Sequence, residues 1–189
     1  FLLNNFAVMV WSSAQPSSVN NMLQAFMSEE QNQFVRVWDR RFCDIDGVYF
    51  SKAQTTKDLL KITSGYSLAD SLYRSVCENY DGYLGIAPEM KDHWTLENIV
   101  LIDDSETKAV RQKDNHVHAS TFEDLYHDDE LVELQRYFEE YVANKDKYPN
   151  LVDYLKEYPW SKFRGRESGA STPAPEPAQG SRRQHIIFS

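Results

Sequence analysis

The chain has 189 residues, of which 41% are hydrophobic, 26% charged and 13% aromatic, a composition that suits one globular domain and excludes a fibrous or wholly disordered chain. The longest apolar run, Phe6 to Trp11, is far shorter than the ~18 residues of a membrane-spanning helix, and the two cysteines, Cys43 and Cys77, are too few for a disulfide framework. The formal net charge of −9 argues against direct binding to nucleic acid, because Lys and Arg supply most of the affinity for a phosphate backbone.

The first strong element begins almost at the first residue, Phe1. No signal or transit peptide is recognised before it. We therefore expect an N-terminally truncated fragment. The low cysteine content favours a reducing, intracellular compartment.

The continuous apolar run Phe6 to Trp11 predicts a strand that is buried on both faces of a parallel sheet. A polar loop follows, and then apolar residues recur at helical spacing behind Pro16, which suits the first turn of a helix: Val19, Met22, Leu23 and Phe26. Residues 34–38 read as a second strand.

Thr55 and Asp58 form a capping-box-like pattern, which predicts a short helix with Lys57 in its first turn. Residues 63–95 are ambiguous, with a suggestion of a helix around Leu68 to Val76 and of an aromatic-rich loop after it. Residues 98–102 form the clearest predicted strand, which ends in two carboxylates.

His116 to Ala119 is predicted to be a further short strand. The apolar spacing over residues 131–142 predicts a helix that begins at Asp128 or Asp129. Because strands alternate with helices, the sequence predicts an α/β fold with a doubly wound, Rossmann-like parallel sheet of three layers. Residues 1–163 would form this domain, and residues 164–189, rich in Gly, Ser, Pro and Arg, would form a disordered tail.

Ligands of open α/β sheets bind outside the carboxyl ends of the strands, where this sequence places Ser12 and the pair Asp103-Asp104. Ser12 could bind a phosphate, or the serines here could simply cap the following helix, which Ser12, Ser13 or Ser17 could do. The two aspartates could form a Mg²⁺ site or an exposed acidic turn. Because successive strand side chains point to opposite sides, the two would have different roles: one would bind the metal and the other would orient a cation. Lys57 could neutralise a phosphate or be an exposed lysine. The order hydroxyl, lysine, acidic pair argues against a receiver domain, in which the acidic pair comes first.

With these residues, the chain resembles the haloacid-dehalogenase (HAD) superfamily. Within it, the chain is similar to the RNA polymerase II C-terminal-domain (CTD) phosphatases and the NLI-interacting-factor-like proteins, which share the FCP homology domain. FAVMVWSSAQP resembles the second motif of the family, with Ser12 at the hydroxyl position. TTKDLLKI resembles the third, with Lys57 at the lysine position. LENIVLIDDSETKA resembles the fourth, with Asp104 at the metal-ligand position and Asp103 as the partner of the lysine. Two further matches are VRVWDRRFC and the closing helix DDELVELQRYFEEYV.

The resemblance implies a hydrolase: a Mg²⁺-dependent protein phosphatase that forms an aspartyl-phosphate. Ser12, Lys57 and Asp103 would be catalytic and Asp104 would bind the metal. The family's nucleophile lies in a DxDx(T/V) motif upstream of the second motif, and no such motif precedes Phe6. The stretch Asp44-Ile45-Asp46-Gly47 matches DxDG only superficially and reads as a turn. The chain shown should therefore be inactive alone.

Three other features carry weaker hypotheses. His116 and His118 could be a metal pair, although a partly exposed strand pair is the simpler interpretation. Aromatic residues of the ambiguous region could line a peptide groove or pack in the core: Tyr80, Tyr83 and Trp94. Residues 171–173, Ser-Thr-Pro, could be modified.

Two functions remain open. The first is a phosphoserine or phosphothreonine phosphatase, monomeric, acting on a phosphoprotein or peptide in the nucleus or cytoplasm. The second is a non-catalytic binding protein on the same fold, similar to the mitochondrial inner-membrane import receptor of the TIM complex. The acidic body of this chain would suit basic, amphipathic presequences.

Overall fold

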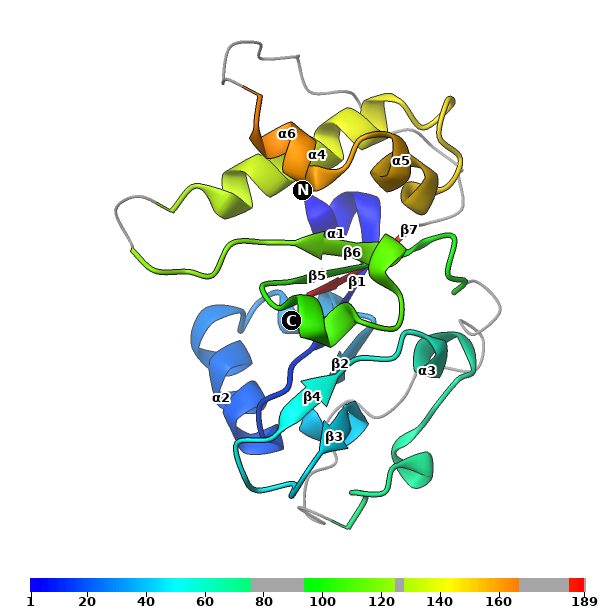
Figure 1. Cartoon of the computed structure of the whole chain (residues 1–189). Helices are drawn as coiled ribbons and strands as arrows, with labels where there is room; N and C mark the ends of the chain where they lie inside the picture. Colours follow the sequence, from blue (N-terminus) through cyan, green and yellow to red (C-terminus); the bar gives the residue numbers. More distant parts are fainter. Residues whose placement is uncertain (76–93, 125–127, 167–183, 189) are drawn as a thin grey trace.

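The structure, a computed structural model, describes residues 1–75, 94–124, 128–166 and 184–188. Five strands form one parallel sheet in the order β2-β1-β7-β5-β6, and two more pair as an antiparallel hairpin (Figure 1). The sheet strands are β1 (Phe6–Trp11), β2 (Arg36–Trp38), β5 (Ile99–Asp103), β6 (His116–His118) and β7 (Gln184–Phe188). The hairpin strands are β3 (Asp44–Asp46) and β4 (Gln54–Thr56).

Helices cover both faces of this sheet. They are α1 (Leu2–Asn5), α2 (Pro16–Phe26), α3 (Leu60–Thr63), α4 (Glu130–Ala143), α5 (Leu151–Glu157) and α6 (Trp160–Arg164). In Figure 1, α4, α5 and α6 lie above the sheet, and the hairpin lies below it. The expected α/β fold with a parallel Rossmann-like sheet is confirmed. No helix in the described part of the chain is long and apolar enough to cross a membrane.

Alternation along the strands explains the two layers, because successive strand side chains point to opposite faces. In β1, Phe6 and Val8 pack with α4, α5 and α6, whereas Met9 and Trp11 pack against the other layer. That other layer contains Trp38, Phe42 and Ile62 of α3. Both faces are covered, so the strands read as unbroken apolar runs rather than as alternating patterns.

The local patterns located most of the elements correctly. The first strand spans Phe6–Trp11 as expected, and the helix behind Pro16 is α2. The strand before the two aspartates is β5. The final predicted helix begins at Glu130, with Asp129 as its N-cap residue and the Asp128 carboxylate accepting from the Glu130 N–H at 3.1 Å.

The expectation of a disordered tail over residues 164–189 is wrong for six of them. Arg164 ends α6, and Gln184–Phe188 form β7 at the centre of the sheet. β7 pairs in parallel with β1 on one side and with β5 on the other. A short apolar segment is stable as a strand when both of its edges are paired, and those partners lie far away in the sequence. Residues 167–183, including 171–173, and residue 189 lie outside the described residues.

The prediction for Lys57 is also wrong. Gln54–Thr56 form strand β4, and Lys57 follows this strand rather than opening a helix. The helix nearby, α3, begins only at Leu60. The two β-branched threonines extend the backbone opposite β3, and this pairing overrides the local capping pattern.

Only part of the ambiguous region can be compared with the expectation. Residues 68–70 form a 3₁₀ helix, whereas residues 76–93, with Tyr80 and Tyr83, lie outside the described residues. Trp94 is buried and its ring lies 3.8 Å from that of His185. Trp94 therefore packs in the core rather than lining an open groove.

Candidate functional site

Lys57 lies in the interior, at the carboxyl edge of the sheet. Its backbone N–H donates to the Lys108 carbonyl at 2.8 Å, and its Nζ lies 2.8 Å from Asp103 Oδ2. Neither side chain is exposed to solvent. Burial lowers the pKa of the Lys57 ammonium, and the Asp103 carboxylate offsets part of that effect. Each charge of this ion pair offsets part of the cost of burying the other.

The two neighbouring aspartates have different surroundings, as the alternation of a strand requires. Asp103 ends β5 and binds inward, to Lys57 and to the Ser105 N–H, which donates to Oδ1 at 2.9 Å. Asp104 is exposed, and its Oδ2 accepts a hydrogen bond from Thr121 Oγ1 at 3.1 Å. Of the two, Asp104 can therefore offer a carboxylate to a cation from solvent.

Ser12 follows β1 and is half-buried. Its N–H donates to the Trp38 carbonyl at 2.8 Å, and its Oγ accepts from the Ala14 N–H at 3.1 Å. The hydroxyl keeps its own hydrogen for a further acceptor. The alternative in which a serine caps α2 is wrong, because the N-cap residue is Gln15 and no side chain caps this helix.

These residues lie on one edge of the sheet, on either side of β7. Phe188, the last residue of β7, pairs with Val10 of β1 and Ile102 of β5. Ser12 comes two residues after Val10, and Asp103 comes one after Ile102. Because neighbouring strands lie ~4.8 Å apart, the two strands that carry Ser12 and Asp103 are about 10 Å apart at this edge. The sequence-predicted residues are thus gathered where ligands of such sheets bind.

The two histidines of β6 form hydrogen bonds with the backbone of the aspartate pair. His116 Nε2 lies 3.0 Å from the Asp103 carbonyl oxygen, and His118 Nε2 lies 3.0 Å from that of Asp104. A carbonyl only accepts, so each Nε2 carries its proton and donates. The pair therefore holds the loop after β5. Within the described residues, no group of three His, Cys, Asp or Glu side chains is placed to hold a metal ion.

His116 predicts a pH dependence of stability. Burial lowers its pKa from 6.5, and the hydrogen bond to the Asp103 carbonyl offsets part of the shift. The unfolded chain then binds more protons below about pH 6.5, so the free energy of unfolding should fall as pH drops from 7 toward the folded pKa, with a slope of at most ~1.4 kcal/mol per pH unit. Urea unfolding from pH 5 to 8 measures this slope. His116→Gln should reduce the slope, and an equal slope in both proteins would contradict the assignment.

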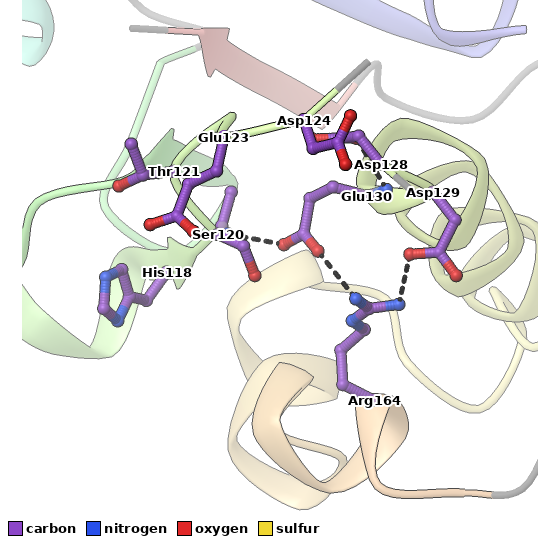
Figure 2. A pocket seen from close by; sticks show the side chains of 10 residues that line it. His118, Ser120, Thr121, Glu123, Asp124, Asp128, Asp129, Glu130 and Arg164 are labelled. Atoms are coloured by element: carbon purple, nitrogen blue, oxygen red, sulfur yellow. Dashed lines mark hydrogen bonds and ion pairs between the residues drawn. The ribbon is translucent and has the colours of Figure 1, made fainter. Parts of the chain in front are cut away.

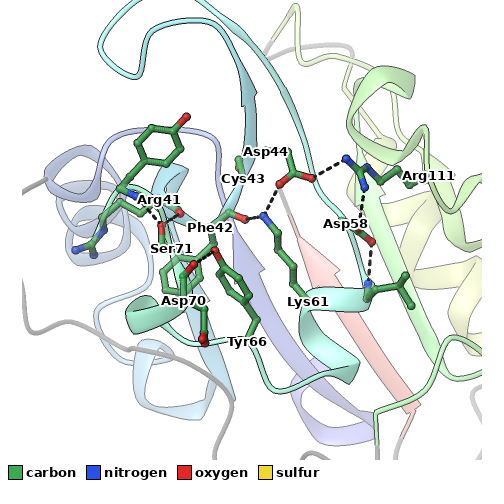
Figure 3. A network of polar contacts seen from close by, with 12 residues as sticks. Arg41, Phe42, Cys43, Asp44, Asp58, Lys61, Tyr66, Asp70, Ser71 and Arg111 are labelled. Carbon is green, nitrogen blue, oxygen red and sulfur yellow. Dashed lines mark hydrogen bonds and ion pairs between the residues drawn. The ribbon is translucent and has the colours of Figure 1, made fainter. Parts of the chain in front are cut away.

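The stretch Asp44-Ile45-Asp46-Gly47 has a structural role. Its first three residues form β3, so the interpretation as a turn is correct only for Gly47, whose φ of +128° suits glycine. Asp44 lies 2.7 Å from Lys61 Nζ and 3.2 Å from Arg111 (Figure 3). This network ties the hairpin to α3 and to the loop after β5.

Arg40 and Cys43 border the site, although no role was predicted for them beyond the resemblance of the segment VRVWDRRFC. The Arg40 guanidinium donates to three carbonyls, those of Tyr49 at 2.8 Å, Ser51 at 3.0 Å and Ser13 at 3.3 Å, and so joins the hairpin to the loop after β1. Cys43 Sγ lies 3.9 Å from the Ser12 carbonyl oxygen. Burial raises the pKa of this thiol. In the sequence, the only indication of this role was the pair of consecutive arginines, Arg40 and Arg41, soon after a predicted strand.

A parallel α/β sheet with a hydroxyl, a buried lysine–aspartate pair and an exposed aspartate at its carboxyl edge defines a HAD-like domain. The chain belongs to the NLI interacting factor-like phosphatase family, whose sequence model matches residues 1–148. It is similar to an uncharacterized FCP1 homology domain-containing protein of Schizosaccharomyces pombe, with 28% identity over 167 residues, 85% of this chain. The chain spans 60% of the length of that relative. No solved structure matches the chain.

Proposed function

We propose that this chain forms the phosphate- and metal-binding part of a Mg²⁺-dependent phosphatase that acts on phosphoserine or phosphothreonine in proteins. The observation that supports this best is the buried Lys57–Asp103 ion pair beside the exposed Asp104. Lys57 neutralises the phosphoryl oxygens, Asp103 positions Lys57, and the Ser12 hydroxyl donates to the phosphate. Asp104 supplies one carboxylate to Mg²⁺, which takes its remaining ligands from water and phosphate.

Turnover in this proposal needs an aspartate nucleophile that the sequence before Phe6 does not contain. A bound Mg²⁺ would screen the charge of the phosphoryl group during transfer. The residues named above bind and orient the phosphate, but they do not form an aspartyl-phosphate. This chain should therefore bind phosphate in the presence of Mg²⁺ without hydrolysing a phosphopeptide.

Titration of the full chain with inorganic phosphate, with and without Mg²⁺, tests the proposal by calorimetry. Phosphate binding should require Mg²⁺. Asp104→Asn should weaken Mg²⁺ binding about tenfold or more, because a tenfold change equals ~1.4 kcal/mol, a modest value for one charged ligand. Asp46→Asn is the matched control, since Asp46 is an exposed aspartate in β3 and should have no effect. Equal Mg²⁺ affinities in the three proteins would contradict the site.

The binding-protein alternative is supported by an acidic cavity of about 580 Å³ beside β6. The lining contains five carboxylates and one arginine: Glu123, Asp124, Asp128, Asp129, Glu130 and Arg164 (Figure 2). Arg164 is engaged with two of them, Asp129 at 3.0 Å and Glu130 at 3.1 Å. The excess of negative charge in this lining would suit a basic peptide.

A labelled basic amphipathic peptide distinguishes this alternative from the phosphatase. If the cavity binds such peptides, fluorescence anisotropy should show binding that weakens strongly between about 0.05 and 0.3 M salt. A peptide with Gln in place of every Lys and Arg is the control. Equal affinity for the two peptides would exclude a charge-directed site.

A further inference from the structure

Among the strands that the structure describes, the parallel sheet consists of two halves that pair only through its central strand. β1 pairs with β2, and β5 pairs with β6. β1 and β5 are separated by β7, which pairs with each of them. In the doubly wound strand order 3-2-1-4-5, the central place belongs to the first strand of the unit, whereas here the last strand of the chain takes it. The space between β1 and β5 is thus a slot for one parallel strand.

The slot binds apolar side chains on both of its faces. Ile186 joins the layer formed with α4, α5 and α6, and Ile187 joins the opposite layer with Trp38 and Trp94. Neither isoleucine is exposed to solvent. At the positions of Ile186 and Ile187, a strand therefore fits here only with apolar side chains on both faces.

Two polar side chains fix the register of that strand. Gln184 Nε2 donates to the Pro149 carbonyl at 3.1 Å, and Gln184 Oε1 accepts from the Leu151 N–H at 3.1 Å. His185 Nδ1 lies 3.2 Å from Asn98 Oδ1, and its ring lies against Trp94. Both side chains are buried. A segment with the order Gln-His can make these contacts, whereas a segment with the order His-Gln cannot, because the two positions face opposite sides of the sheet.

The occupant and the walls of the slot are separate parts of the chain. Every described wall residue lies within residues 1–166, and the segment is joined to them through residues 167–183. All contacts of β7 are non-covalent, so a segment from another copy could make the same ones. A linker gives its own segment an effective concentration of about 1 mM, so an intact chain fills its own slot at lower protein concentrations.

We propose that the slot between β1 and β5 is a sequence-specific binding site for an extended peptide, and that it accepts Gln184–Phe188 of a second copy of this chain. Two copies can then exchange central strands, and each completes the sheet of the other. The chain's own segment competes with the incoming one. This inference does not depend on the proposed phosphatase function.

The test uses full-length chains with a weakened central strand, Ile187→Ala and the milder Ile187→Val. The probe is a synthetic peptide with the sequence of residues 181–189, SRRQHIIFS. At about one hundred times its Kd, the peptide should raise the Tm of a weakened variant by roughly 5 °C or more. The Tm of the wild-type chain should rise less, because its slot is filled.

A peptide in which the Gln and the His are exchanged is the matched control, and it should give little or no rise. If neither peptide raises the Tm of a folded variant, or if both raise it equally, the proposal is wrong. Should Ile187→Ala fail to fold, the result with Ile187→Val decides.

Exchange between copies has its own test. Wild-type chain refolded at about 1 mM should contain a dimer, detected by light scattering, that is missing after refolding at about 1 µM. A monomer at both concentrations would exclude exchange between copies.

Discussion

Replacing Lys57 by Met should lower the free energy of unfolding by about 3–5 kcal/mol, because the substitution leaves the Asp103 carboxylate buried without its cation. Neither side chain of this pair is exposed, and their charged atoms lie 2.8 Å apart. Met preserves most of the volume of Lys, so the loss reports the charge rather than a cavity. Urea unfolding monitored by circular dichroism measures it.

The partner variants separate the charge from the packing. Asp103→Leu should be destabilised to a similar degree, whereas the double variant Lys57→Met/Asp103→Leu should recover much of the loss, since no unpaired charge remains. Lys156→Met is the matched control, because its ion pair with Asp114 is largely exposed and spans 3.7 Å, so removing it should have little effect. Additive losses in the double variant would show that the two charges do not compensate each other.

The strands that carry the candidate site could be predicted because their signals are local. β1 and β5 are continuous apolar runs that end in Ser12 and in Asp103-Asp104. A strand that is buried on both faces needs such a run, and a parallel sheet brings its carboxyl ends to one edge. Sequence reasoning could therefore place Ser12 and the aspartates on a common edge. Their catalytic roles stay predictions.

The features that were predicted wrongly depend on partners outside the local pattern. Lys57 follows β4 because Thr55 pairs with Ile45, a contact that the local capping pattern does not contain. His116 and His118 form the partly exposed strand pair that was the simpler interpretation, but the local pattern does not contain their hydrogen bonds to the Asp103 and Asp104 carbonyls. Composition indicated a polar, Pro-rich tail, but it could not show that Gln184–Phe188 within it lie between β1 and β5.

β7 supplies the other large expected effect. Replacing Ile186 by Ala should lower the free energy of unfolding by about 2–5 kcal/mol, as for other fully buried isoleucines, although the residue lies almost at the end of the sequence. Ile186 pairs with Val8 on one side and Val100 on the other, so a cavity here loosens both halves of the sheet. Urea unfolding measures the loss.

Leu72→Ala is the control for this substitution, because Leu72 is 90% exposed and its removal should change stability by no more than ~0.5 kcal/mol. An Ile186→Ala loss as small as that of the control would mean that the segment does not occupy the sheet in solution. A loss in the expected range would instead make the last strand of the sequence the element that joins the Ser12 strand to the Asp103 strand. The geometry of the candidate site then depends on β7, even though β7 contributes none of the four proposed site residues.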